Sequence, residues 1–200
     1  RTSLDAYSNI RVTGIIGVAI EDGDALLAAR IVKTGQQVLI GTAQGMSIRF
    51  AEADCRPMGR ATAGVRGVAL REGDRVVGLE VLGTEGAILT AAARGLGKRT
   101  AIAEYRQQGR GGLGLINLKV TERTGQVVGV AQVLPGDQVI LITQDGMIIR
   151  TAVDGIREIG RSTQGVKLID LEGEDRLVAI AKVLEREEEE ATGEPVAGEE

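Results

Sequence analysis

Three nine-residue stretches decide how this chain is organised: "RPMGRATAG" at residues 56–64, "RQQGRGGLG" at 106–114 and "REIGRSTQG" at 157–165. All three fit the pattern R-x-x-G-R-x-x-x-G, and they begin 50 and 51 residues apart. Self-similarity at a fixed period of this length is the signature of a repeat architecture. The chain is therefore expected to consist of units of about 50 residues.

Other features keep the same step along the chain. A glycine turn and a strand-like segment precede each loop: "AQGMSIRF", "ARGLGKRT" and "QDGMIIRT". The segments that follow the loops, "GVRGVALREGD", "GLINLKVTERTG" and "GVKLIDLEGED", are also alike, and "GIIGVAIEDGD" is the same element one period earlier. We expect complete repeats at 14–63, 64–113 and 114–164, with partial repeats at 1–13 and 165–184.

The composition favours an all-β fold. Hydrophobic residues make up 43% of the chain, with 29 glycines and almost no aromatic side chains, which suits short strands joined by tight turns. Each unit reads as about four strands; in the first, "GIIGVAIE", "ALLAARIVK", "QQVLIGTA" and "MSIRFAEA" are separated by turn dipeptides that end in glycine. Four strands per repeat indicate the blade of a propeller rather than a rung of a solenoid, although the Trp-Asp signature of WD40 repeats is missing.

Charge is distributed unevenly along the chain. Residues 185–200, "EREEEEATGEPVAGEE", hold eight glutamates and one arginine and carry −7, whereas the rest of the chain holds 23 basic and 20 acidic side chains and carries +3. We expect an acidic, disordered tail behind a mildly basic folded body. The tail is either a solvated solubility tail or a segment that competes electrostatically for the basic surface.

The residue types exclude several classes of function. Histidine is absent and Cys55 is the only cysteine, so no structural zinc site, metal centre or His-based nucleophile is expected. No apolar run reaches the roughly 18 residues that span a membrane, and a single cysteine fits a reducing cytoplasm. The chain opens with "RTSLDAYSN", without Met, and is expected to be a fragment of a longer protein.

The repeats resemble the C-terminal domain of the DNA gyrase A protein, in the bacterial type II topoisomerase family. The residues that carry the resemblance are "GVRGVALREGDRVVGLEV" (64–81), "GAILTAAARGLGKRTAIAEY" (86–105), "KVTERTGQVVGVAQV" (119–133) and "GRSTQGVKLI" (160–169). The resemblance implies a β-pinwheel, a propeller-like ring of four-stranded blades that exchange strands. This chain would supply a partial ring, residues 1–184, followed by the disordered acidic tail.

The family's signature is a seven-residue gyrase box, Q-basic-R-G-G-basic-G. The matching stretch here supplies Gln, Arg and three glycines, but Gly109 and Leu113 replace the two flanking basic residues. We interpret it as a box-like copy of the loop between blades, consisting of Gln108, Gly109, Arg110, Gly111, Gly112, Leu113 and Gly114.

The recurrent arginines are the candidate DNA contacts. Duplex DNA is a regular anionic rod, and affinity without sequence preference comes from Arg and Lys that neutralise phosphates. Alternation along residues 46–50 places Arg49 opposite the apolar Met46, Ile48 and Phe50, and glycines in the loops let backbone N–H groups approach a phosphate. The candidates are Arg49, Arg56, Arg60, Lys98, Arg99, Arg106, Arg110, Lys119, Arg150, Arg157 and Arg161. The alternative is that they are solvated or paired surface charges.

The resemblance implies a non-catalytic domain that binds and wraps duplex DNA. In the family this domain contributes to ATP-dependent negative supercoiling by a heterotetramer of gyrase A and gyrase B, in which ATP and Mg²⁺ are used by other domains; no cofactor is expected in this chain. Two alternatives remain: the equivalent domain of topoisomerase IV, and a propeller-like scaffold for protein partners.

Overall fold

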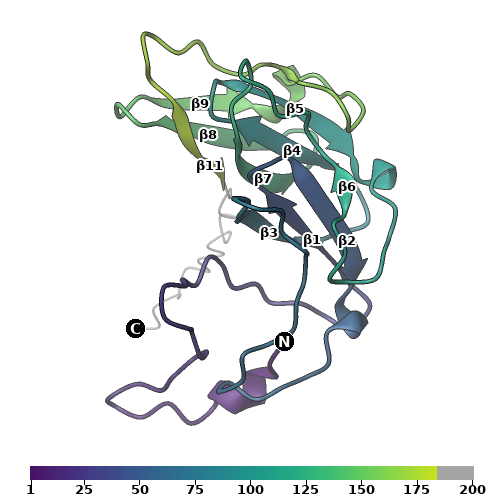
Figure 1. The fold of residues 1–200 in the computed structure, drawn as a ribbon, viewed down its shortest axis with the longest axis vertical. Helices are drawn as coiled ribbons and strands as arrows, with labels where there is room; N and C mark the ends of the chain where they lie inside the picture. The colour runs from purple at the N-terminus through teal and green to yellow at the C-terminus, as the bar shows by residue number, and fades with distance from the viewer. Residues whose placement is uncertain (184–200) are drawn as a thin grey trace, which may run out of the picture.

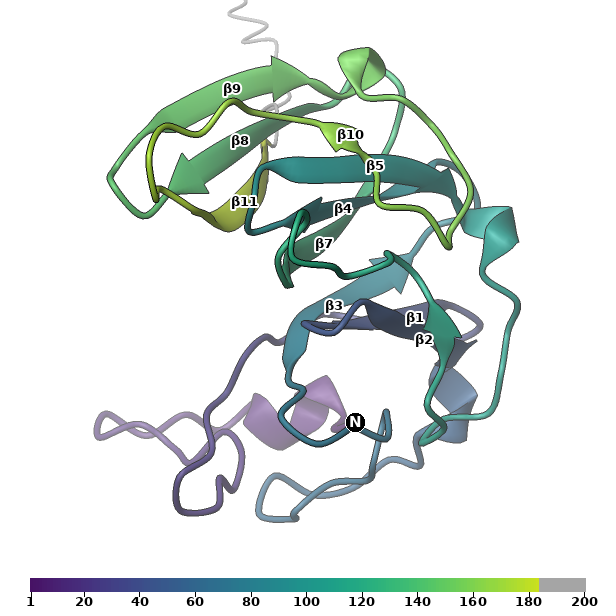
Figure 2. The ribbon, with the colours of Figure 1, turned by 45° about the horizontal axis from the view of Figure 1, so that its top comes forward.

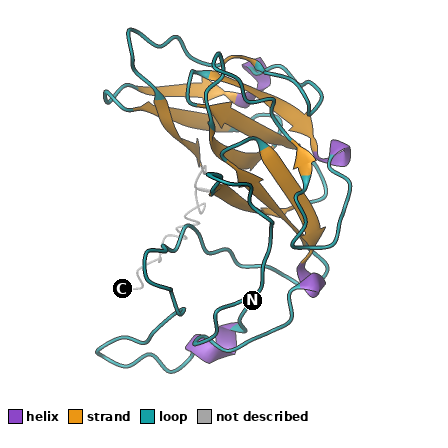
Figure 3. Cartoon of the chain, viewed as in Figure 1, coloured by secondary structure: helices purple, strands orange, loops and turns teal. Residues whose placement is uncertain are grey.

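The structure is a computed structural model that describes residues 1–183, so the predicted acidic tail lies outside the described residues. The described chain is almost entirely strand and loop (Figure 3), which confirms the all-β prediction. The strands are β1 (Gln37–Thr42), β2 (Met46–Ala51), β3 (Val76–Leu82), β4 (Ala87–Ala92), β5 (Leu96–Ala101), β6 (Leu115–Ile116), β7 (Val127–Val133), β8 (Gln138–Thr143), β9 (Ile148–Ala152), β10 (Val166–Lys167) and β11 (Leu177–Val183). Four short 3-10 turns accompany them: η1 (Leu4–Tyr7), η2 (Glu52–Asp54), η3 (Ile102–Glu104) and η4 (Val153–Gly155).

The strands form three antiparallel sheets that follow one another through the molecule (Figure 1). Their strand orders are β3-β1-β2-β6, β10-β5-β4-β7 and β11-β8-β9. Each sheet is built on a tight hairpin whose first strand also pairs with a later strand, as β1 pairs with both β2 and β3. The three later strands, β3, β7 and β11, pack side by side and form the inner edge of the arrangement.

The sheets are out of phase with the repeats expected from the sequence. Each sheet takes its hairpin and inner strand from one continuous segment: residues 37–82, 87–133 and 138–183. The expected repeats that begin at residues 64, 114 and 165 cut these three segments near their middles. Residues 14–33, expected to contribute two strands, form none, because they have no partner strand within the described residues.

Two strands are exchanged between successive units. β6 lies in the second segment but pairs with β2 of the first sheet, where Ser47 faces Leu115. β10 lies in the third segment but pairs with β5 of the second sheet, where Gly97 faces Val166. The exchange links each sheet to its neighbour by backbone hydrogen bonds in addition to side-chain packing.

Small residues allow the sheets to approach closely. Val130 of β7 packs on Gly78 of β3, where an added Cβ would lie 2.5 Å from its Cγ2 atom. Ile180 of β11 packs on Gly129 of β7 in the same way, with its Cγ1 atom 2.8 Å from the position of an added Cβ. Apolar clusters of fully buried residues fill the spaces between the sheets, so each sheet depends on its neighbour for its core.

Aspartates close equivalent turns at three places in the chain, two of them directly before β3 and β11. The carboxylates of Asp24, Asp74 and Asp175 each accept a hydrogen bond from the backbone N–H of the next residue, at 2.8, 2.8 and 2.7 Å. A hydrogen bond from the Thr143 side chain, helped by backbone N–H donors, holds the pKa of Asp175 below its ordinary value. These contacts give the three aspartates a structural role in their turns.

Candidate nucleic-acid interface

The loops with the R-x-x-G-R pattern run along the outer edges of the sheets. The loop at 106–114 runs alongside β2, where Gln108 N–H donates to the Arg49 carbonyl at 2.8 Å. The loop at 157–165 runs alongside β5, where Ile159 N–H donates to the Arg99 carbonyl at 2.9 Å. The short turns that precede the three loops, η2, η3 and η4, follow one another around the edge of the molecule, from the lower right of Figure 2 (blue) past its right side (teal) to its top (green). Homologous loops therefore recur along one rim.

The second arginine of each loop is a structural anchor. Arg60, Arg110 and Arg161 are half-buried. Their guanidinium groups donate to the backbone carbonyls of residues 16, 66 and 116, respectively, which are themselves one repeat apart. Arg110 also donates from Nε to the Asp54 carbonyl at 2.8 Å. Each of these arginines ties its loop to the equivalent segment of the preceding repeat.

The first arginine of each loop is exposed. Arg56, Arg106 and Arg157 occupy corresponding positions, and their side chains make no hydrogen bond or ion pair with any residue in the described part of the chain. Exposed guanidinium groups that are not committed to a protein acceptor can form bidentate contacts with phosphate. Of the predicted set, these three have the geometry that a rim of phosphate contacts requires.

The strand arginines hold neighbouring units together. Arg49 of β2 donates from one nitrogen to the carbonyls of Ile102 and Tyr105, both at 2.9 Å, and so pins η3 of the next unit. Burial lowers the pKa of Arg49 from its ordinary value. Arg99 repeats the contact one unit later, from Nε to the Ile156 carbonyl at 2.7 Å, with Asp154 at 3.6 Å. Arg150 is exposed, and its only side-chain hydrogen bond among the described residues is to Gln138.

Lys98 departs most from its predicted role. Its side chain is 0% exposed, and its ammonium donates to the carbonyls of Gly160, at 2.6 Å, and Arg161. Burial, aided by the nearby charge of Arg161, lowers its pKa to about 8. This geometry argues against the expected phosphate contact, because a fully buried ammonium that is bound to carbonyls has no surface to offer. Lys119, in contrast, is exposed.

The box-like loop joins the first two units. Gly111 N–H donates to the Gly67 carbonyl at 2.6 Å, and the Gly112 carbonyl accepts from Ala69 N–H at 2.9 Å. Gly114 lies against β2, where an added Cβ would be only 2.2 Å from the Ser47 carbonyl oxygen. Gly109 and Leu113, which replace basic residues of the family's box, face solvent, so the substitutions remove charge without disturbing packing.

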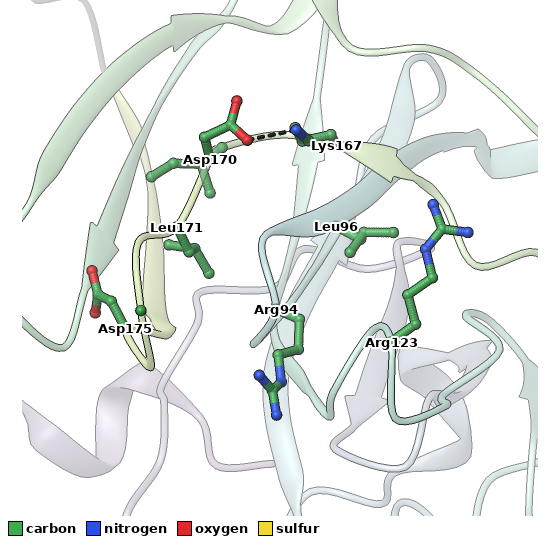
Figure 4. A pocket seen from close by; sticks show the side chains of 9 residues that line it. Arg94, Leu96, Arg123, Lys167, Asp170, Leu171 and Asp175 are labelled. Atoms are coloured by element: carbon green, nitrogen blue, oxygen red, sulfur yellow. Dashed lines mark hydrogen bonds and ion pairs between the residues drawn. The ribbon is translucent and has the colours of Figure 1, made fainter.

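Three further cations surround a shallow hollow that the repeat pattern did not reveal (Figure 4). Arg94, Arg123 and Lys167 line it, and Lys167 is paired with Asp170. Arg94 occupies the place of Gln44 and Asp145 in the other hairpin turns, so a search for recurrent residues does not detect it. Positive charge at the surface makes Arg94 and Arg123 further candidates for a phosphate path.

Other kinds of site lack support in the described residues. Among residues 1–183, no group of three or more His, Cys, Asp or Glu side chains is placed to hold a metal ion. No helix in the same part of the chain is long and apolar enough to cross a membrane. Cys55 is a free thiol and half-buried.

The fold and its rim define a class: a propeller-like repeat protein whose successive blades exchange strands and present arginines at one edge. Within that class, the family model described as "DNA gyrase C-terminal domain, beta-propeller" matches residues 1–33, 36–82, 87–133 and 137–183. The chain belongs to the DNA gyrase C-terminal domain family. The last three matched segments coincide with the three continuous segments that supply the hairpin and inner strand of each sheet, and the match confirms the propeller-like prediction.

Proteins similar to this chain in sequence or structure include DNA gyrase A proteins and the C-terminal domain of a topoisomerase IV. The chain is 44% identical over 183 residues to the DNA gyrase A protein of Clostridium acetobutylicum and 43% identical over 190 residues to that of Escherichia coli, covering 92% and 95% of this chain. It spans 22% of each relative's length. A solved gyrase A C-terminal domain matches with a TM-score of 0.79 and 27% identity, covering 86% of this chain and 59% of that one. The C-terminal domain of a DNA topoisomerase IV has the same fold, with a TM-score of 0.85 at 24% identity, covering 91% and 57%.

Proposed function

We propose that this chain binds duplex DNA along the rim formed by its inter-blade loops. The observation that carries the proposal is the recurrence of Arg56, Arg106 and Arg157: exposed, free of partners among residues 1–183, and at the same place in successive units. Three guanidinium groups at regular steps suit the repeating phosphates of a duplex, and their charge gives affinity without sequence preference.

The curvature of the rim gives the DNA a bent path. Smooth bending of twenty to thirty base pairs costs about 1–6 kcal/mol, which contacts available only along the bent path can offset. The scarcity of aromatic side chains, 2% of the chain, disfavours single-stranded nucleic acid, whose binding depends on base stacking. The domain would therefore wrap double-stranded DNA.

In a larger protein, the domain would act as the non-catalytic wrapping module of DNA gyrase A. Gyrase A and gyrase B would form the heterotetramer that negatively supercoils DNA in the cytoplasm, with ATP and Mg²⁺ handled by other domains. DNA gyrase A relatives at 43–44% identity support this assignment.

The proposal is tested by measuring duplex affinity over a salt series. The variant carries Arg56→Ala, Arg106→Ala and Arg157→Ala. Each phosphate contact contributes about 0.9 to the slope of log affinity against log salt, so the slope should become shallower by about 2.7. Unrelated duplex sequences should give the same result.

The matched control removes three exposed arginines from turns that lead into inner strands: Arg71→Ala, Arg75→Ala and Arg176→Ala. It changes the net charge by the same amount as the loop variant, and it should leave most of the slope of log affinity against log salt intact. Equal losses in the two triple variants would show that affinity depends on overall charge alone. If the parent chain does not bind duplex DNA at low salt, a protein-binding scaffold becomes the better account.

A further inference from the structure

The middle loop of the rim carries two exposed apolar side chains. Leu113, near the end of the loop, is 50% exposed, and Ile116 of β6, the outermost strand of the first sheet, is 45% exposed. Neither side chain belongs to an apolar cluster in the described part of the chain. The packing of the fold therefore does not explain why these two residues are apolar.

The neighbouring units hold cations where the middle unit holds Ile116. The corresponding residues are Arg66 one unit earlier and Lys167 one unit later, and both side chains are exposed. Among these three units, the exchanged segment thus loses its exposed cation only in the middle one.

Adjoining repeats pack against this loop on both sides. Gly111 N–H donates to the Gly67 carbonyl at 2.6 Å on one side, and the Arg161 guanidinium donates to the Ile116 carbonyl at 3.2 Å on the other. Leu113 and Ile116 remain exposed although both adjoining segments are in place.

The backbone that carries the two side chains is held firmly. The Gly112 carbonyl accepts from Ala69 N–H at 2.9 Å. Gly114 lies so close to β2 that an added Cβ would be 2.2 Å from a carbonyl oxygen of that strand, and Ile116 follows in β6, which pairs with β2. Leu113 is therefore displayed on a fixed support, which lowers the entropy that is lost when a ligand binds.

Arginines stand at both ends of the apolar segment. Arg66 is exposed, and its side chain makes no hydrogen bond or ion pair within residues 1–183. Its Cγ and Cδ atoms lie 4.0 Å from the position of an added Cβ at Gly111. Arg161 lies at the other end, on the Ile116 carbonyl. Phosphates bound at these two arginines would bring the groove between them over the apolar side chains.

The span between the two arginines suits a major groove. Gly111, beside Arg66, and Ile116, beside Arg161, are five residues apart in the sequence. Five residues of extended chain reach at most about 16–18 Å. The major groove is about 12 Å wide, whereas the minor groove is about 6 Å wide. The segment is therefore long enough to face the floor of a major groove.

We propose that Leu113 and Ile116 contact thymine methyl groups in the major groove of the duplex that the rim binds. The inference rests on the proposed function, because these side chains meet bases only if DNA follows the rim. The C5-methyl of thymine is the apolar feature of the major groove, and apolar side chains recognise it. The contact adds a modest preference for A·T pairs to an affinity that otherwise comes from charge.

Duplexes with deoxyuridine in place of thymidine test the contact, because this exchange removes the methyl group and keeps the base pair. Two otherwise identical G·C-rich duplexes carry a central A·T tract, one with thymine and one with uracil, and compete for the chain at one salt concentration. Burial of one methyl group corresponds to about a three- to fourfold change in affinity. The parent chain should prefer the thymine duplex by at least that factor.

The double variant Leu113→Ala/Ile116→Ala should bind the two duplexes equally. Its matched control is Leu70→Ala, which shortens a leucine that is 45% exposed in the segment leading to the turn before β3, and which should keep the parent's preference. Methyl removal also alters the stiffness of the duplex, but that effect is shared by every variant, so the difference between variants isolates the contact. A parent chain without a preference, or a double variant that retains one, would overturn the inference.

A salt series with Ile116→Lys provides an independent arm. The variant places at residue 116 the cation that Lys167 supplies in the next unit, so the slope of log affinity against log salt should become steeper by about 0.9. An unchanged slope would show that the duplex does not pass over Ile116 and would refute the contact. A parent chain that binds both duplexes equally leaves the proposed function intact, whereas one that binds neither at low salt removes both.

Discussion

Replacing Gly114 with alanine should destabilise the domain far more than the same change at Gly64. Both glycines have a positive φ, +79° and +83°, so each alanine bears similar backbone strain, about 1–2 kcal/mol. Only at Gly114 does the new Cβ meet backbone, the Ser47 carbonyl oxygen at 2.2 Å and its carbon at 2.7 Å. The difference between the two variants therefore isolates the close approach of the exchanged strand.

The clash can be relieved only by moving β6 away from β2. Loss of that two-residue pairing removes hydrogen bonds worth about 1 kcal/mol each, and the displaced backbone adds overpacking strain of about 1–3 kcal/mol. We expect Gly64→Ala to lower the free energy of unfolding by about 1–2 kcal/mol and Gly114→Ala by about 3–5 kcal/mol. Urea unfolding of dilute protein gives both values, provided that the slopes with denaturant match.

Gly165→Ala supplies an internal check, since its Cβ would lie 2.5 Å from the Gly97 carbonyl oxygen. It should lower the free energy of unfolding by about as much as Gly114→Ala does. Equal losses at Gly64 and Gly114 would refute the reasoning, because they would mean that φ alone, and not the strand exchange, explains why glycine stands at these positions.

Two further predictions concern buried cations. The pKa of Lys98 falls to about 8 from 10.5 on folding, so between these pH values the unfolded chain binds more protons than the folded one. The free energy of unfolding should therefore rise by about 3 kcal/mol as the pH rises through this range. Urea titrations of Lys98→Met should lack this rise. Arg49→Ala should lower the free energy of unfolding by about 2–4 kcal/mol in the same assay, because it leaves the Ile102 and Tyr105 carbonyls without their charged donor. Arg150→Ala should lower it by less than about 1 kcal/mol. Similar decreases for the two variants would mean that the hydrogen bonds from Arg49 to the next unit contribute little to stability.

The repeat could be predicted because glycines and arginines recur wherever the backbone makes the same turn. The spacing of the three loops, the glycine turns and the scarcity of aromatics indicated an all-β propeller-like fold. The residues at which each blade begins and ends could not be found in this way. A period does not state which strands share a sheet, and strand exchange places β6 and β10 in the sheet before their own segment.

The roles of individual cations were less predictable than their positions. Arg56 and Arg60 look equivalent in sequence, yet the first is exposed and the second is anchored to a carbonyl. Lys98 occupies the place of Ile48, which strand alternation puts on the apolar face, so its burial could have been predicted; its carbonyl acceptors could not, because they come from residues more than sixty positions away. Such long-range contacts leave no local pattern. Phosphate binding by any of the candidates stays a prediction.

The bend of bound DNA is the measurement that tests the central claim most directly. A duplex of about 40 base pairs with a donor and an acceptor dye at its ends reports end-to-end distance, and a path along the rim must shorten that distance. The account predicts increased energy transfer on binding the parent chain, and a smaller increase with Arg106→Ala, the middle of the three exposed loop arginines, at saturating protein. Saturated binding with no change in energy transfer would contradict the account, because the duplex would then be bound straight and the recurrent loops would not define its path.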